Sequence, residues 1–180
     1  MLTKQDKDML LRIARKSIEA GFAGGELSRF ETGSKTLEEK MGAFVTLKKQ
    51  GRLRGCIGFI EGRKSLYETV EEMAQAAAFR DPRFRPVKED ELCDLDIEIS
   101  VLTPLMQIED ISEIEVGRHG LYIVKGPHSG LLLPQVATEY SWDRATFLRE
   151  ACVKAGLSQE AWKNPNAKIF IFSASIFGED

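Results

Sequence analysis

Cysteine and histidine are scarce in this 180-residue chain, and their spacing excludes several kinds of site. Cys56, Cys93 and Cys152 form no CxxC pair, so the sequence predicts reduced thiols in a cytoplasmic protein and no disulfide framework. His119 and His128 are the only histidines, and they show no HxxxH spacing. We therefore expect no bound metal.

Long apolar runs and nucleotide-binding glycine patterns are missing as well. No stretch approaches the roughly 18 apolar residues of a membrane span, and the charged N-terminus does not resemble a secretory signal. The glycines at positions 55 and 58 lack the strand-to-helix context of GxGxxG or of a P-loop, so we expect no cofactor. The composition, 43% hydrophobic, is enough to bury a core and excludes a disordered chain.

The charge is uneven, although the net charge is only −3. The segment 48–88 holds ten basic and five acidic residues, which gives it +5 and leaves −8 for the rest of the chain. Such a segment is either an anion site or a solvated face. Nucleic-acid binding is disfavoured, because the protein is acidic overall and few aromatic residues lie among these cations.

Hydrophobic periodicity predicts an N-terminal amphipathic helix at residues 4–20, followed by two β-β-α-β segments. The first consists of strands 42–49 and 53–60, a helix that begins after Ser65 and stops at Asp81-Pro82, and strand 95–103. The second consists of strands 119–125 and 130–133, helix 143–155 and strand 168–176. Residues 42–46 and 120–124 match in pattern at an offset of 78, which indicates an internal duplication.

This order predicts an α+β protein, residues 1–180 forming a single domain built from two interlocked repeats at about 42–103 and 119–176. Each hairpin leaves an apolar face that its own helix cannot cover. We therefore expect the repeats to share one mixed, mostly antiparallel sheet system, with a groove between the halves.

The segment Leu53-Arg54-Gly55-Cys56-Ile57-Gly58 is the most unusual part of the chain. Alternation along a strand places Arg54, Cys56 and Gly58 on one face and Gly55 on the other. Two glycines in one strand suggest the close approach of a ligand or of another backbone. Cys56 is expected beside the positive charge of Arg54.

Cys56 is a candidate nucleophile, because a neighbouring cation favours the thiolate form. The alternative is a small buried side chain that only fills space. His119 is the candidate base, since equivalent halves would turn it toward the first hairpin. It is equally a residue that forms a hydrogen bond at a sheet end or caps a loop.

Residues 81–86, Asp-Pro-Arg-Phe-Arg-Pro, form a loop stiffened by two prolines, which can present Arg83 and Arg85 to an anionic ligand. The alternative is a structural turn in which Asp81 pairs with Arg83. Gln135 follows Pro134 and can offer an amide to the groove. The candidate site therefore comprises Cys56 and His119 as catalytic residues, with Arg54, Gly55, Gly58, Arg83 and Gln135 as ligand-binding residues.

Ordered motifs along most of the chain identify a family. They are Gly42–Leu47, Leu53–Gly58, Asp81–Phe84, Ile99–Leu102, Gly117–Leu121, Leu132–Ala137, Phe147-Leu148 and Cys152–Gly156. In these segments the sequence resembles the AMMECR domain family. The resemblance implies a mixed α+β fold of two unequal subdomains, with the six-residue motif at their cleft and no established reaction. It also implies partners, since family members occur beside Memo-type and radical SAM proteins.

Two functions remain open. The first is an enzyme, or a subunit of one, that acts on a small or peptide-like anionic substrate with Cys56 as nucleophile. The second is a non-catalytic adaptor whose cleft binds a partner protein or the cofactor of that partner.

Overall fold

We describe residues 2–24, 30 and 32–179 in a computed structural model. The chain forms two compact units: unit 1 comprises Met1–Leu102 with Ser175–Asp180, and unit 2 comprises Thr103–Ala174. Each unit combines helices with one four-stranded sheet and has its own hydrophobic core. The α+β class and the N-terminal helix are thus confirmed.

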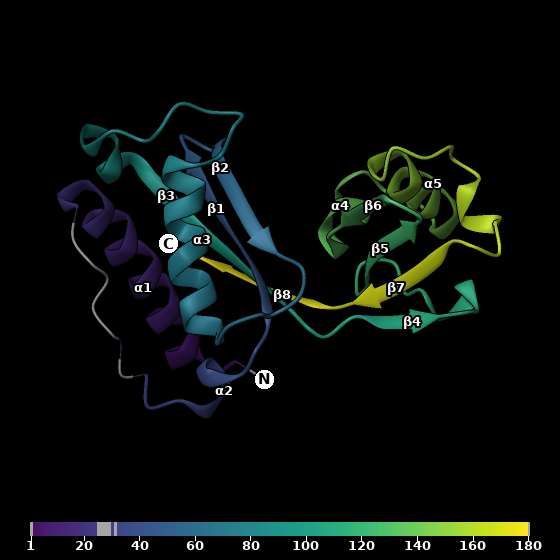
Figure 1. Ribbon diagram of the computed structural model, residues 1–180, viewed down its shortest axis with the longest axis horizontal. Coiled ribbons are helices and arrows are strands. Elements are labelled where there is room, and N and C mark those ends of the chain that lie inside the picture. The colour runs from purple at the N-terminus through teal and green to yellow at the C-terminus, as the bar shows by residue number, and fades with distance from the viewer. Residues whose placement is uncertain (1, 25–29, 31, 180) are drawn as a thin grey trace. The chain divides into compact units, whose positions relative to one another are not determined.

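Unit 1 contains the first β-β-α-β segment. Its elements are α1 (Lys4–Ala23), α2 (Lys35–Glu38), β1 (Gly42–Lys49), β2 (Arg52–Phe59), α3 (Leu66–Phe79), the 3-10 helix η1 (Glu89–Asp94), β3 (Leu95–Leu102) and β8 (Ala174–Gly178). The strand order is β2-β1-β3-β8, and β1 is antiparallel to both of its neighbours. Helices α1 and α3 pack on one face of this sheet (Figure 1), and no helix of the described part of unit 1 packs on the other face.

Both α1 and α3 begin with a capping box, formed by Thr3 with Asp6 and by Ser65 with Glu68. In α1 the Thr3 hydroxyl accepts a hydrogen bond from the Asp6 backbone N–H, and the Asp6 carboxylate accepts one from Thr3. The predicted apolar stripe of this helix, including Leu10 and Ile18, is buried. The helix runs three residues beyond the expected position 20, because Gly24 (φ 63°) provides the left-handed end.

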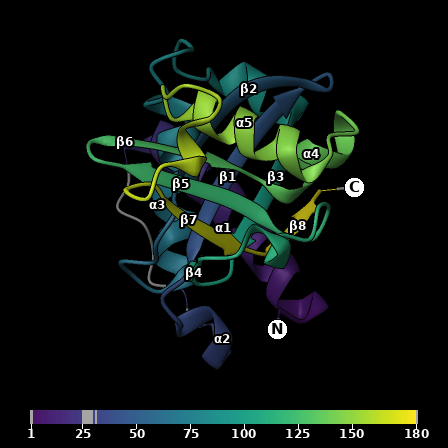
Figure 2. The same ribbon diagram turned by 90° about the vertical axis from the view of Figure 1, so that its right-hand side faces the viewer.

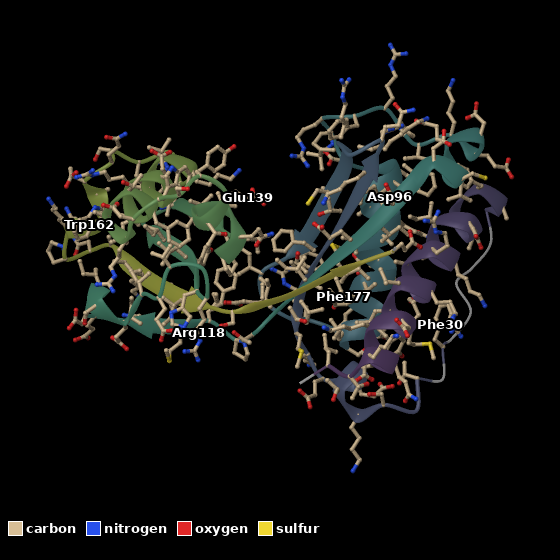
Figure 3. All side chains as sticks on the ribbon, turned by 180° about the vertical axis from the view of Figure 1, so that it is seen from behind. Phe30, Asp96, Arg118, Glu139, Trp162 and Phe177 are labelled. Atoms are coloured by element: carbon tan, nitrogen blue, oxygen red, sulfur yellow. The ribbon has the colours of Figure 1, made fainter. Side chains whose placement is uncertain are left out.

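The last residues of the chain are held to unit 1 by Arg15 of α1. Its guanidinium donates to the Glu179 carboxylate and to the carbonyls of Leu92 and Leu95. The Glu179 carboxylate also accepts the N–H of Ile97 at 3.0 Å. Beside this ion pair, Phe177 of β8 lies next to α1 (Figure 3), with the Lys7 ammonium 5.5 Å from its ring centre.

Unit 2 contains the second β-β-α-β segment. Its elements are β4 (Met106–Ile108), the 3-10 helix η2 (Ile111–Glu113), β5 (Gly120–Lys125), β6 (His128–Leu132), α4 (Pro134–Glu139), α5 (Arg144–Lys154), the 3-10 helix η3 (Ala161–Lys163) and β7 (Lys168–Phe172). The strand order is β4-β7-β5-β6, as Figure 2 shows. Phe147, Leu148 and Cys152 of α5 are fully buried in its core, which confirms Cys152 as a core residue.

The expectation of one common sheet is wrong, since the two repeats build separate four-stranded sheets. Their orders match: β2-β1-β3 in unit 1 corresponds to β6-β5-β7 in unit 2. The fourth strand of each sheet comes from the end of the other repeat, because β4 follows β3 and β8 follows β7 along the chain. The predicted strand 168–176 is therefore divided at Ser173, whose backbone hydrogen-bonds with Thr103. Each sheet is thus completed by a strand that follows the other repeat along the chain.

Glu71 of α3 provides a test of electrostatics in the core of unit 1. Its Oε1 atom is buried and has no hydrogen-bond partner among the described residues, and burial followed by the charge of Glu68 raises the pKa of this carboxyl. A raised pKa in the folded state favours folding below the ordinary value of 4.5, and this contribution is lost as the pH rises through the raised pKa.

We therefore expect Glu71→Gln to increase the free energy of unfolding by about 1 kcal/mol at pH 7 and to leave it unchanged at pH 4. Urea unfolding at both pH values measures this. Exposed Glu19 of the neighbouring helix is the matched control, and Glu19→Gln should change stability by less than about 0.5 kcal/mol at either pH. Equal effects of Glu71→Gln at pH 4 and pH 7 would contradict the electrostatic explanation.

Candidate functional site

The six-residue motif lies in β2, an edge strand of the sheet of unit 1. Its side chains alternate as expected. Gly55 is buried against α3, and a β-carbon there would stand 2.2 Å from the carbonyl oxygen of Ala77. Gly58 faces the other way, where a β-carbon would stand 2.4 Å from the ring of Phe44. On these sides the room left by the glycines is filled by the protein itself.

Cys56 is partly exposed on the helix-free face of the sheet, directly opposite Thr46 of β1. The Thr46 hydroxyl donates a hydrogen bond to the Cys56 sulfur at 3.3 Å. The same row of the sheet continues to Glu98 of β3, whose carboxylate accepts from the Lys48 ammonium at 2.8 Å. The thiol therefore has a polar neighbour on the same face of the sheet, unlike a cysteine that only fills an apolar core.

The loop after α3 binds the backbone of Cys56. The Asp81 carboxylate accepts the Cys56 N–H at 2.9 Å, and the Arg83 guanidinium donates to the Cys56 carbonyl at 3.0 Å. Both groups of Cys56 point away from β1, toward the open edge of the sheet, so the Asp81–Arg83 pair takes the place of a neighbouring strand. The arginine also binds Asp81 through its backbone N–H, Nε and Nη2, at 2.7–3.1 Å.

Burial differs sharply within this ion pair. The Asp81 side chain is 1% exposed and that of Arg83 is 55% exposed. The hydrogen bond from Arg83 is the main cause that holds the pKa of Asp81 far below its ordinary value, so this carboxylate stays ionised. The pKa of Arg83 is raised, mainly by its hydrogen bond with Asp81.

Arg54 lies on the same strand but binds a different partner. Its Nε and Nη2 atoms donate to the Glu91 carboxylate at 3.2 and 2.9 Å, and Nη1 donates to the Arg85 carbonyl at 2.9 Å. The hydrogen bond from Arg54 is the main cause that lowers the pKa of Glu91, to about 2. The arginine that contacts Cys56, at its backbone carbonyl, is thus Arg83, and each of the two arginines is paired with its own carboxylate, Arg83 with Asp81 and Arg54 with Glu91. Arg83 and the backbone of Arg85 thus lie against the motif strand.

His119 and Cys56 belong to different units, so the equivalence of the repeats does not by itself bring them together. His119 directly precedes β5, and its Nδ1 atom accepts the N–H of Glu115 at 3.2 Å. The backbone N–H of His119 donates to the Glu115 carbonyl at 2.9 Å. These bonds correspond to the alternative interpretation, in which His119 caps a loop.

Gln135 is the second residue of α4 in unit 2. Its Oε1 atom is buried and has no hydrogen-bond partner within residues 2–24, 30 and 32–179. An unpaired amide oxygen is costly unless water or another group binds it, so this position fits a polar contact without identifying one.

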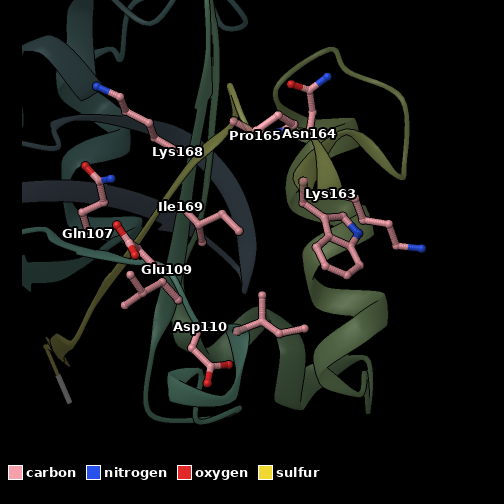
Figure 4. A pocket seen from close by; sticks show the side chains of 12 residues that line it. Gln107, Glu109, Asp110, Lys163, Asn164, Pro165, Lys168 and Ile169 are labelled. Atoms are coloured by element: carbon pink, nitrogen blue, oxygen red, sulfur yellow. The ribbon is translucent and has the colours of Figure 1, made fainter.

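A cavity of about 630 Å³ also lies in unit 2, between β4 with η2 on one side and η3 on the other. None of the residues proposed from the sequence lines it. Figure 4 shows that Lys163 and Lys168 extend away from each other, so the charged ends do not converge on a ligand. Among the described residues, no group of three or more His, Cys, Asp or Glu side chains could hold a metal ion.

Sequence reasoning missed two residues that shape the motif. Glu91 lies in an acidic stretch that shows no pattern, and only the fold brings it to Arg54. Thr46 belongs to the predicted strand 42–49, and its contact with Cys56 depends on the register of the hairpin. Asp81 was expected to pair with Arg83, but its bond to Cys56 could not be read from the sequence.

Comparison with known proteins gives consistent matches along the chain. The AMMECR1 family model matches residues 11–177. Protein MK0488 of Methanopyrus kandleri is 43% identical over 99% of this chain and 91% of its own length, and protein SSO0193 of Saccharolobus solfataricus is 44% identical over 95% and 80%. The crystal structure of uncharacterized protein PH0010 from Pyrococcus horikoshii matches with a TM-score of 0.88 at 43% identity, covering 96% of this chain and 90% of that one. No helix in the described part of the chain is long and apolar enough to cross a membrane.

Proposed function

This chain belongs to the AMMECR1 family, and from that premise we propose that it is an enzyme, or a subunit of one, that uses the Cys56 thiol on a small or peptide-like anionic substrate. The thiolate would attack an electrophilic carbon of the substrate, forming an S–C bond while the leaving group departs with the bonding electrons. The observation that carries the proposal is the exposed guanidinium of Arg83, fixed to the backbone of a partly exposed cysteine.

Three features of unit 1 support this assignment. The Arg83 guanidinium lies at the Cys56 backbone, and cations near a cysteine generally favour the thiolate form in proteins. The Thr46 hydroxyl donates to the sulfur and would stabilise its negative charge further. The bonds from Asp81 and Arg83 to the Cys56 backbone fix the position of the thiol, and a reactive group needs such fixing.

A binding function without chemistry is the second candidate. Two residues proposed for the chemistry have other partners, which favours this candidate. Arg54, proposed to bind the substrate, is bonded to Glu91, and His119, proposed as the base, is bonded to Glu115. In this function the motif would shape a surface for a partner protein, and the resemblance to companions of Memo-type and radical SAM proteins suggests which partners to examine first.

The reactivity of the thiol tests the proposed nucleophile. We expect iodoacetamide to alkylate Cys56 in the native protein at least about tenfold faster than Cys152, because Cys152 is fully buried and burial raises the pKa of its thiol. Exposed Cys93 is an internal control that should react freely. Mass-spectrometric mapping of all three sites measures the rates together. If Cys56 were alkylated no faster than Cys152, the proposed role of Cys56 as nucleophile would be refuted.

A binding experiment with immobilised protein distinguishes the enzyme from the adaptor by the molecules that the protein retains. Immobilised wild-type protein, Cys56→Ser and Cys93→Ser are exposed to a metabolite extract and, separately, to a protein lysate. A small anionic molecule retained by wild type and Cys93→Ser but lost from Cys56→Ser supports the enzyme. Retention of the same partner protein by all three, with no small molecule, supports the adaptor.

A further inference from the structure

The motif strand holds the loop at residues 81–91 at two points. At the first, the Cys56 backbone binds Asp81 and Arg83. At the second, Arg54 donates to the carbonyls of Arg85 and Pro86 and to the Glu91 side chain. Glu91 in turn accepts the backbone N–H of Lys88 at 3.1 Å. The loop is thus anchored on both sides of Arg85, which fixes its backbone along the edge of β2.

Anchoring leaves guanidinium N–H donors of this loop without a partner among the described residues. Arg83 uses Nε and Nη2 for Asp81 and Cys56, whereas its Nη1 has no hydrogen-bond partner among the described residues. The Arg85 side chain is exposed and likewise has no ion-pair or hydrogen-bond partner in the described part of the chain. Guanidinium groups with free N–H donors are the usual ligands of carboxylates and phosphates in proteins.

The acidic groups of the loop do not cancel this charge evenly. Asp81 is buried beneath Arg83, and Glu91 is bonded to Arg54 and Lys49. Exposed Glu89 and Asp90 lie in η1, at the far end of the segment from Arg83. The end of the loop that touches Cys56 therefore carries the surplus of positive charge.

We infer that Arg83 and Arg85 form an oxyanion-binding site beside Cys56, which takes a carboxylate or phosphate group of the substrate, and that Arg54 is a positioning residue that holds the loop in place. This inference rests on the proposed function of Cys56 and names the group by which its substrate is recognised. In this arrangement Arg54 of the motif has a structural role, and the loop residues Arg83 and Arg85 contact the substrate.

The charge of an alkylating reagent tests the site through the thiol. Iodoacetate carries a carboxylate and iodoacetamide is its neutral counterpart, so the ratio of their rates at one cysteine reports the local charge. We expect this ratio to be at least about fivefold higher at Cys56 than at Cys93, which has acidic neighbours, and to fall toward the Cys93 value in 1 M NaCl.

Substitutions of single arginines test the binding and positioning roles separately. Arg83→Gln and Arg85→Gln should each lower the ratio at Cys56 at least about threefold, and exposed Arg52→Gln in the same strand should leave it unchanged. Arg54→Lys retains the charge but not the forked contacts, so it should lower the ratio nearly as much as Arg54→Gln. Full retention by Arg54→Lys would assign Arg54 a charge effect and overturn its positioning role. Equal ratios at Cys56 and Cys93 in the wild type would overturn the oxyanion site.

A second measurement does not need a reactive thiol. In Cys56→Ser, ¹⁵N NMR titrations with inorganic phosphate and with acetate are followed at the Nε–H groups of Arg83 and Arg85. Saturable shifts that Arg83→Gln abolishes support the site, and the more effective anion identifies the group that it prefers. Absence of any shift up to 50 mM of either anion overturns the inference, whereas an inert Cys56 together with clear shifts would refute only the nucleophile.

Discussion

Replacing Gly55 by alanine is expected to destabilise the protein by about 3 kcal/mol or more, because the added β-carbon would lie 2.2 Å from the carbonyl oxygen of Ala77. That oxygen belongs to the backbone of α3, so the clash cannot be relieved by the rotation of a side chain. Either the helix or the edge strand has to move. For a chain of this size the loss corresponds to a fall in melting temperature of roughly 6–12 °C.

Urea unfolding followed by circular dichroism measures the loss, and Gly178→Ala is the matched control. Gly178 lies in β8 of the same sheet, where a β-carbon would stand 3.2 Å from the Ile97 carbonyl oxygen and needs only a small adjustment. We expect this control to change stability by less than about 1 kcal/mol. If Gly55→Ala were as harmless as Gly178→Ala, the space at Gly55 would be open after all, and a ligand rather than α3 would explain the glycine.

Removal of the Asp81 carboxylate should have the second large effect. Asp81→Ala deletes the acceptor of the Cys56 N–H and the buried partner of Arg83. Breaking a buried ion pair costs about 3–5 kcal/mol, but Arg83 is largely exposed and water can solvate the charge that remains. We therefore expect a loss of about 2–3 kcal/mol in the free energy of unfolding, together with slower alkylation of Cys56.

The pH dependence of this variant has a defined sign. The folded-state pKa of Asp81 is lowered by Arg83, so the carboxylate stabilises the fold above the ordinary value of 3.8, and this contribution is lost as the pH falls toward the lowered pKa. The difference between wild type and Asp81→Ala should therefore be full at pH 7 and shrink below pH 4. Arg118→Ala, which breaks an exposed pair with Glu115, is the control and should cost less than about 0.5 kcal/mol. A pH-independent difference would show that packing, and not charge, accounts for the loss.

Local patterns in the sequence were sufficient for most elements. The apolar stripe and capping box of α1 and the turn between β1 and β2 depend on neighbours within a few residues, and all are present. The alternation of β3 holds from Leu95 to Ile99 and is then lost, because Ser100 is buried as well. The matching residues at Gly42 and Gly120 likewise begin equivalent strands, β1 and β5. The sequence did not indicate which strands share a sheet, because β4 and β8 leave their own repeats and pair with strands far away in the chain.

The motif illustrates the same limit at the level of single residues. Its two glycines indicate close approach, but the sequence does not say whether a ligand, a helix or an aromatic ring approaches; the structure places Ala77 and Phe44 there. The sequence also suggested Arg54 as the cation for Cys56. In the folded chain Arg54 binds Glu91, and Arg83 from the next loop reaches Cys56.

The sequence by itself determined the α+β class, the duplicated β-β-α-β order, the family and the unusual composition of the six-residue motif, since each depends on residue types and short spacings. Only the tertiary structure decided which groups meet. The separation of two sheets, the contact of Arg83 with the Cys56 backbone, and the placement of His119 in unit 2 depend on strand register and on loops that approach from distant positions. Hydrogen bonds and burial select such long-range pairs, and no local pattern records them.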